Sequence, residues 1–134
     1  MIRTLDACAM IAYLRDEPGA DVVEEALMRP GDTCLAHVLN LAEVYYDFAR
    51  AVDEATAGAA IQDLYAGGVT PRDDVDEAFW QEAARYKAAY RRISLADCFC
   101  VTLARRVGGD LLTSDHHELG AIAPLGIVPI RFIR

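Results

Sequence analysis

The chain has 134 residues, of which 54% are apolar and 25% are charged, which is typical of one globular domain, here spanning residues 1–134, with a core of its own. It carries 21 acidic against 13 basic side chains, a net charge of −8. This balance excludes a protein that holds nucleic acid by phosphate neutralisation alone. Any contact with RNA or DNA needs another source of positive charge, such as bound metal ions or a local basic patch.

Hydropathy and cysteine spacing indicate the compartment. No stretch approaches the roughly 20 apolar residues of a membrane span, and the first residues lack the pattern of a signal peptide. We therefore expect a soluble, cytoplasmic protein without membrane contact. No cysteine pair has the two-residue spacing of a zinc knuckle or a redox motif, so we expect Cys8, Cys34, Cys98 and Cys100 to be buried thiols.

Apolar periodicity, capping residues and glycine or proline breaks predict short strands that alternate with helices. The expected strands are Met1–Leu5, Thr33–Ala36, Val69–Thr70, Leu111–Thr113 and Ile127–Ile130. The expected helices are Ala7–Leu14, one with Pro18 in its first turn that ends at Met28, His37–Arg50, Asp53–Ala66, Asp73–Tyr90, one capped by Ser94 that ends at Val107, and a turn over Asp115–Leu119. This alternation predicts a three-layer α/β domain with a mostly parallel sheet of five strands.

Two carboxylates lie at the ends of predicted strands. Asp6 follows the first strand, and Asp115 follows the strand that ends at Thr113. The carboxyl ends of parallel strands share one edge of a sheet, where open α/β folds build their sites. Helix capping is a structural explanation that stays open for both, since Asp6 precedes a helix and Asp115 forms an acidic variant of a capping box with Glu118.

Asp97 is the only charged residue between Ile93 and Ala104. A helix that is apolar on nearly all sides is a buried helix, and a carboxylate on it needs a partner or a metal ion. The alternative is that Asp97, three residues after Ser94, only completes a capping box at the start of the helix.

Glu43 shares the polar face of its predicted helix with Asn40 and Asp47, where solvation is the ordinary explanation. Together with the three aspartates it forms a set of acids near strand ends and helix starts, which meet at one edge of a parallel sheet. Converging carboxylates repel one another unless divalent cations neutralise them, and oxygen-rich sites select Mg²⁺ or Mn²⁺. Two such ions about 4 Å apart can activate water for phosphodiester displacement, and they supply the positive potential that the acidic chain lacks.

Three segments, in this order and spacing, carry a family resemblance across almost the whole chain. They are TLDACAMIAYLRDEPGA from residue 4, AHVLNLAEVYYDF from residue 36 and SLADCFCVTLARRVGGDLLTSDHHEL from residue 94. This pattern resembles the PIN-domain ribonucleases and, within them, the VapC-type toxins of bacterial and archaeal VapBC toxin–antitoxin pairs. The family's acidic set corresponds to Asp6, Glu43, Asp97 and Asp115, with Thr113 as the hydroxyl of its Thr-x-Asp element.

The resemblance implies a sheet of strand order 3-2-1-4-5 flanked by helices, a homodimer, and cleavage of RNA by water activated by Mg²⁺ or Mn²⁺. It also implies a cognate VapB-type antitoxin whose C-terminal segment lies over the active site. As hypotheses, Asp6, Asp97 and Asp115 hold the main metal ion, and Glu43 binds it through water or completes a second site. Thr113 orients Asp115 or a bound water, unless it is only a β-branched strand residue.

Other polar residues have both a functional and a structural explanation. In the functional explanation, Asn40, one helical turn before Glu43, is an auxiliary contact of the acidic site. In the functional explanation, His37, His116 and His117 contact metal or RNA. In the structural one, His37 is a solvated residue at a helix start, and His116 and His117 are solvated residues of a turn. The densest basic stretch contacts RNA phosphates, or it complements a helix C-terminus on a solvated face. Its members are Arg85, Lys87, Arg91 and Arg92.

Three other classes of protein compete with the nuclease interpretation. A catalytically silent PIN-like module for dimerisation or partner binding is the main one, and the intact acids argue against it. A haloacid dehalogenase-type phosphohydrolase needs a second Asp two residues after Asp6, where the chain has Cys8. A phosphorylated receiver domain needs a lysine at a late strand end, whereas Lys87, the only lysine, lies within a predicted helix.

Overall fold

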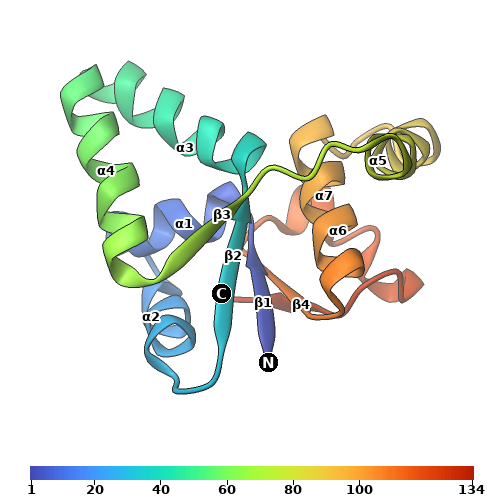
Figure 1. Ribbon diagram of the computed structural model, residues 1–134, viewed down its shortest axis with the longest axis horizontal. Helices are drawn as coiled ribbons and strands as arrows, with labels where there is room; N and C mark the ends of the chain where they lie inside the picture. The colour runs from blue at the N-terminus through green and yellow to red at the C-terminus, as the bar shows by residue number, and fades with distance from the viewer.

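A five-stranded, fully parallel sheet of order β3-β2-β1-β4-β5 forms the centre of the computed structural model, which describes residues 1–134 (Figure 1). The strands are β1 (Ile2–Leu5), β2 (Thr33–His37), β3 (Val69–Arg72), β4 (Asp110–Thr113) and β5 (Ile130–Phe132). The helices are α1 (Ala7–Leu14), α2 (Ala20–Met28), α3 (Val38–Ala51), α4 (Glu54–Gly67), α5 (Glu77–Ala89), α6 (Leu95–Val107) and α7 (His116–Leu119), with a 3₁₀ turn at Ala123–Leu125. The expected α/β class and strand order are confirmed.

The helices form two layers, with α1 to α4 on one side of the sheet and α5 to α7 on the other (Figure 1). Each layer has its own apolar core, and neighbouring strand residues point into different cores. In β4, Leu112 belongs to the core that includes Met10 and Val23 of the first layer, whereas Leu111 belongs to the core that includes Phe99 and Leu103 of the second. Strands buried on both faces read as largely apolar runs, which is why the central strands β1, β2 and β4 could be found in the sequence.

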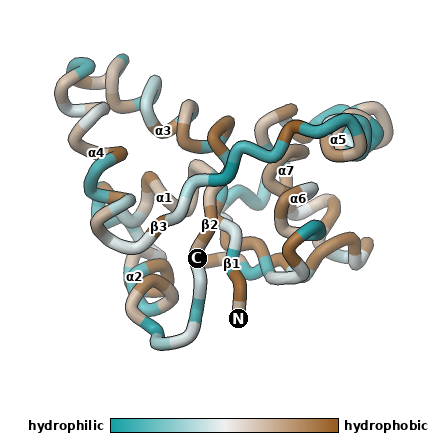
Figure 2. Tube along the Cα trace, in the orientation of Figure 1, coloured by the Kyte–Doolittle hydropathy of each residue, from teal (hydrophilic) through white to brown (hydrophobic).

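The predicted helix Asp73–Tyr90 begins four residues later, at Glu77. Its acidic start resembles the first turn of a helix, but Asp74 is bound in an extended segment. The Asp74 carboxylate accepts hydrogen bonds from Arg72 and Arg106 at 2.9–3.0 Å, and its carbonyl oxygen lies 2.9 Å from His37 Nε2. Tertiary contacts therefore override local propensity in this hydrophilic connection between β3 and α5 (Figure 2).

Other boundaries also differ from the prediction, among them the end of β3, which continues through Pro71 to Arg72 instead of ending at Thr70. The last strand is shifted from Ile127–Ile130 to Ile130–Phe132, because Pro129 has no N–H and contributes only its carbonyl oxygen, which accepts from Leu111 at 2.9 Å. Pro18 precedes α2 instead of lying in its first turn, and Gly19 is the N-cap, with φ of 96°. A side chain there would approach the Ile133 carbonyl to 2.8 Å, so the site favours glycine.

Three of the four cysteines are buried and Cys8 is half-buried, all as free thiols. None of the helices combines the length and the apolar character needed to cross a bilayer.

Candidate metal centre

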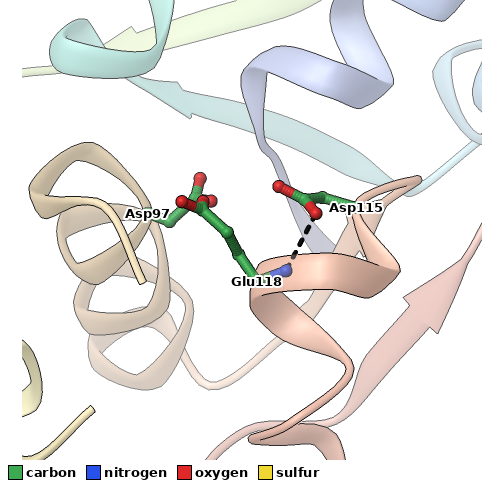
Figure 3. A group of neighbouring side chains, drawn as sticks. All are labelled: Asp97, Asp115 and Glu118. Atoms are coloured by element: carbon green, nitrogen blue, oxygen red, sulfur yellow. Dashed lines mark hydrogen bonds between the residues drawn. The ribbon is translucent and has the colours of Figure 1, made fainter. Parts of the chain in front are cut away.

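Three carboxylates converge where α6 meets the start of α7, at the carboxyl edge of the sheet. One oxygen from each of Asp97, Asp115 and Glu118 lies within 4.8 Å of the others. Figure 3 shows the Asp97 and Glu118 side chains reaching toward each other from the two helices, with Asp115 beside them. Carboxylates this close repel one another unless protons or a cation neutralise them.

Strand ends and helix starts place the aspartates. Asp6 ends β1 and caps α1, with Oδ1 accepting from the Ala9 N–H at 2.8 Å. Asp115 follows β4 and caps α7, with Oδ1 accepting from the Glu118 N–H at 2.9 Å. The capping explanations are thus correct for both residues. They do not compete with a site role, because each cap uses one oxygen. The second oxygen of Asp115 is left for a ligand, whereas that of Asp6 accepts a hydrogen bond from Thr113.

Thr113, the last residue of β4, links these two aspartates. Its hydroxyl donates to Asp6 Oδ2 and accepts from the backbone N–H of Asp115 at 2.9 Å. It is completely buried, so its hydrogen bond to Asp6 is shielded from water. Thr113 therefore fixes the Asp6 carboxylate and the backbone of Asp115, rather than the carboxylate of Asp115 itself.

Asp97 lies in the first turn of α6, where the Ser94 hydroxyl accepts from its N–H at 3.1 Å. The side chain is buried. Burial, and then a hydrogen bond shared with Glu118, raise the pKa of Asp97 to about 10. The nearby charges of Asp6 and Glu43 act in the same direction, so the metal-free cluster retains a proton at neutral pH.

Asp6 and Glu43 border this group. Burial raises the pKa of Asp6 to about 7, against the lowering effect of its hydrogen bonds to Thr113 and Ala9, and the charge of Asp115 raises it further. Burial also raises the pKa of Glu43, with contributions from Glu118 and Asp115. Glu43 Oε1 is buried and has no hydrogen-bond donor in the chain. All four predicted acids therefore lie at one end of the sheet and interact electrostatically.

The donor set fits a hard divalent cation. Every candidate ligand atom is a carboxylate oxygen, as Mg²⁺ and Mn²⁺ prefer. Burial, and then the neighbouring carboxylates, raise the pKa of Asp6 and Asp97, and a bound cation would counter both effects. Asp97, Asp115 and Glu118 are close enough to share one ion. Asp6 and Glu43 remain for its waters or for a second ion.

Glu118 is the candidate site residue that the sequence did not identify. Its spacing from Asp115 indicated a capping box, and its backbone N–H does make that hydrogen bond. The side chain, however, turns to Asp97 (Figure 3). A glutamate three residues after a strand-end aspartate was the available signal. Only the Glu118 N–H takes part in this cap, and the Asp115 N–H donates to Thr113, so the Glu118 carboxylate is free.

Several other polar residues have structural roles. The buried His37 caps α3 and contacts Asp74, and His116 stacks on Phe132 at 4.0 Å between ring centroids. Lys87 donates to the carbonyl oxygens of Arg91 and Ile93 at 2.8 Å, so it closes the turn from α5 to α6. Four other residues that the sequence singled out as possible contacts of metal or RNA are exposed: His117, Arg85, Arg91 and Arg92.

The family model described as PIN domain matches residues 4–123. Among solved structures, VapBC2 from Rickettsia felis, bound to a DNA fragment from its promoter, superposes with a TM-score of 0.75 at 13% identity and covers 98% of each chain. VapBC-1 from nontypeable Haemophilus influenzae gives 0.72 at 17% identity, over 99% of this chain and 98% of that one.

Mycobacterium tuberculosis VapC20, described as a sarcin–ricin loop cleaving toxin, gives a TM-score of 0.71 at 15% identity, over 89% of this chain and 94% of that one. No curated protein sequence matches the chain. At these identities the structural likenesses establish a common fold.

Proposed function

This chain belongs to the PIN domain family, and we propose that it is a divalent-metal-dependent endoribonuclease, the toxin of a VapBC-type toxin–antitoxin pair. The observation that carries the proposal is the carboxylate cluster at the carboxyl edge of the sheet, in which Asp97 is buried and Asp115 and Glu118 are half-buried. The VapC and VapBC structures that share its fold over nearly the whole chain support the assignment. The cleavage of an RNA loop named for VapC20 supports RNA as the substrate class.

We assign the ion, Mg²⁺ or Mn²⁺, to Asp97, Asp115 and Glu118, with Asp6 and Glu43 completing the acidic wall. When bound, such ions activate water and stabilise the charge of a phosphodiester displacement. The chain's own part is to hold the carboxylates in place. The Thr113 hydroxyl donates a hydrogen bond to Asp6. The caps of α1 and α7 fix one oxygen of Asp6 and one of Asp115.

A protein partner follows from the same comparison. The neighbouring structures include VapBC complexes, and we propose a VapB-type antitoxin as the partner of this chain and a homodimer as its own assembly. An acidic toxin, with net charge −8, suits a partner segment that carries basic side chains to the carboxylate edge.

The deciding experiment is cleavage of a pool of structured RNAs by the purified chain in Mn²⁺, compared with EDTA and with Asp97→Asn. We expect cut products only with metal and an intact Asp97. We also expect growth arrest on expression of the wild-type chain but not of Asp97→Asn. A folded wild-type protein that binds no Mn²⁺ and cuts no RNA would support the silent binding module instead.

A further inference from the structure

Asn40 has a buried amide that is only half satisfied. Its side chain is 0% exposed, and Nδ2 donates to the carbonyl oxygen of Ala96 at 3.3 Å. Oδ1 is also buried, and no donor in the chain reaches it. An unsatisfied buried acceptor lowers the stability of the fold, so the position favours a ligand that supplies the missing donor.

The location of this amide connects it with the carboxylate cluster. Ala96 directly precedes Asp97 in the first turn of α6, so the Asn40 hydrogen bond ties α3 to the residue before a candidate metal ligand. Glu43 lies one turn further along α3, and its Oε1 is likewise buried without a donor. Two acceptor oxygens without donors thus lie one turn apart on the helix that borders the site.

We propose that Asn40 is a positioning residue of the metal site, an inference that rests on the proposed function. Its Nδ2 fixes the first turn of α6, and with it the Asp97 carboxylate, while its Oδ1 accepts a hydrogen bond from a water molecule of the bound ion's hydration shell. Such outer partners orient ligands, and their loss typically weakens metal binding about 10–100-fold.

An amide is suited to both tasks. Leucine has nearly the same shape and would remove the unsatisfied oxygen, so packing alone gives no reason for asparagine at a completely buried position. An aspartate would turn the donor to Ala96 into a second acceptor and would add another charge to a group of acids that already repel one another. Only a neutral side chain with one donor and one acceptor satisfies both neighbours.

The first test compares Mn²⁺ affinity, measured by calorimetric titration, in the wild type, Asn40→Leu and Thr102→Val. Thr102 is a control because it is a buried polar residue on α6, the helix that Asn40 contacts, and its hydroxyl donates to the Cys98 carbonyl at 2.7 Å. We expect Asn40→Leu to weaken Mn²⁺ binding about tenfold or more, and Thr102→Val to leave it unchanged. Equal Mn²⁺ affinity in folded Asn40→Leu and wild type would overturn the proposal.

A second measurement needs no variant. Asn40 is the only asparagine of the chain, so protein labelled with ¹⁵N-asparagine gives a single side-chain NH₂ pair in an NMR spectrum. We expect this pair to shift on titration with Mg²⁺, following the same saturation curve as metal binding. A pair that stays in place at saturating Mg²⁺ would contradict the proposal even if Asn40→Leu fails to fold.

The outcomes separate this inference from the proposed function. Wild-type protein that binds Mn²⁺ and cuts RNA, with an Asn40→Leu variant of equal affinity, refutes the role of Asn40 alone. Wild-type protein that binds neither Mn²⁺ nor Mg²⁺ refutes the proposed metal site, and the role of Asn40 with it.

Discussion

Single side chains at the candidate site serve folding and chemistry together. Asp6 and Asp115 each use one oxygen to cap a helix, and Thr113 joins them through one hydroxyl. Negative charge at a helix N-terminus is stabilised by the backbone dipoles, which offsets part of the mutual repulsion of these acids. The same local geometry that starts the helices therefore assembles the ligands of a cation.

Glu118 gives a prediction that separates its side chain from its backbone. Glu118→Gln removes one charge from the cluster and leaves the cap intact, because the cap uses the Glu118 N–H. We expect the fold to persist and Mn²⁺ affinity and RNA cleavage to fall about tenfold or more, as for loss of a ligand or its close partner. Calorimetric titration and a cleavage assay measure the two effects.

The matched control is Glu54→Gln, which makes the same chemical change at an exposed position in the first turn of α4. It should leave both quantities unchanged. If Glu118→Gln behaves like Glu54→Gln, then Glu118 serves only as part of a capping box, as its spacing first indicated.

At this scale the sequence predicted which acids gather but not which of them are in closest contact. Asp6, Asp97 and Asp115 were identifiable because strand ends and an apolar helix make a carboxylate conspicuous. Glu118 was not, since its spacing already had a local explanation. The approach of Asp97 to Glu118 depends on how α6 packs against α7, and neither helix encodes that angle by itself.

The strands are held at the end of the sheet opposite the site by a buried ion network. Arg3 of β1 donates to Asp32, just before β2, at 3.1 Å and to Asp110 of β4 at 2.8 Å. The arginine side chain is 7% exposed and the two carboxylates are 8% and 15% exposed. This network joins the three central strands at their amino ends and fixes their register.

Arg3→Met is therefore expected to destabilise the domain without touching the site. Removing one partner of a buried ion network leaves charges that are desolvated and unpaired, and we expect the melting temperature to fall by about 5 °C or more. Thermal unfolding followed by circular dichroism measures it.

Adding Asp32→Asn and Asp110→Asn to Arg3→Met should recover part of the loss, because the unpaired charges are then gone. Mn²⁺ affinity at room temperature should remain that of the wild type in both variants. An unchanged melting temperature for Arg3→Met alone would show that the network contributes nothing to stability.

Elements whose limits are set locally were predicted well, and those set by tertiary contacts were not. Helix α1 has its predicted bounds, and α6 has its predicted cap and end, because Asp6, Ser94 and Gly108 provide caps at their ends. The start of α5 was misplaced because long-range partners hold Asp74 in an extended segment. No pattern within the acidic stretch itself shows that an arginine on α6 binds there.

For the whole molecule, the buried acids link stability to pH and to metal. The pKa of Asp6 is raised to about 7 and that of Asp97 to about 10, above their values in the unfolded chain. Between the ordinary aspartate value of about 4 and these raised values, the folded protein therefore holds more protons than the unfolded chain. As pH rises through this window the metal-free protein must lose those protons, so its stability falls, by up to about 1.4 kcal/mol per pH unit for each group.

We accordingly expect the melting temperature of the metal-free protein, in EDTA, to decrease from about pH 5 to about pH 8. Saturating Mg²⁺ should reverse this trend, because the ion binds the ionised carboxylates and stabilises only the folded state. In Asp97→Asn, the melting temperature in EDTA should decrease less with rising pH, and Mg²⁺ should raise it by less than in the wild type. Below this window, Asp32, Asp53 and Asp74, whose pKa values are lowered by hydrogen bonds, oppose the trend. A metal-free melting temperature that rises steadily to pH 8 would contradict the protonated state of the cluster, because carboxylates that stay protonated in the fold make stability fall as pH rises.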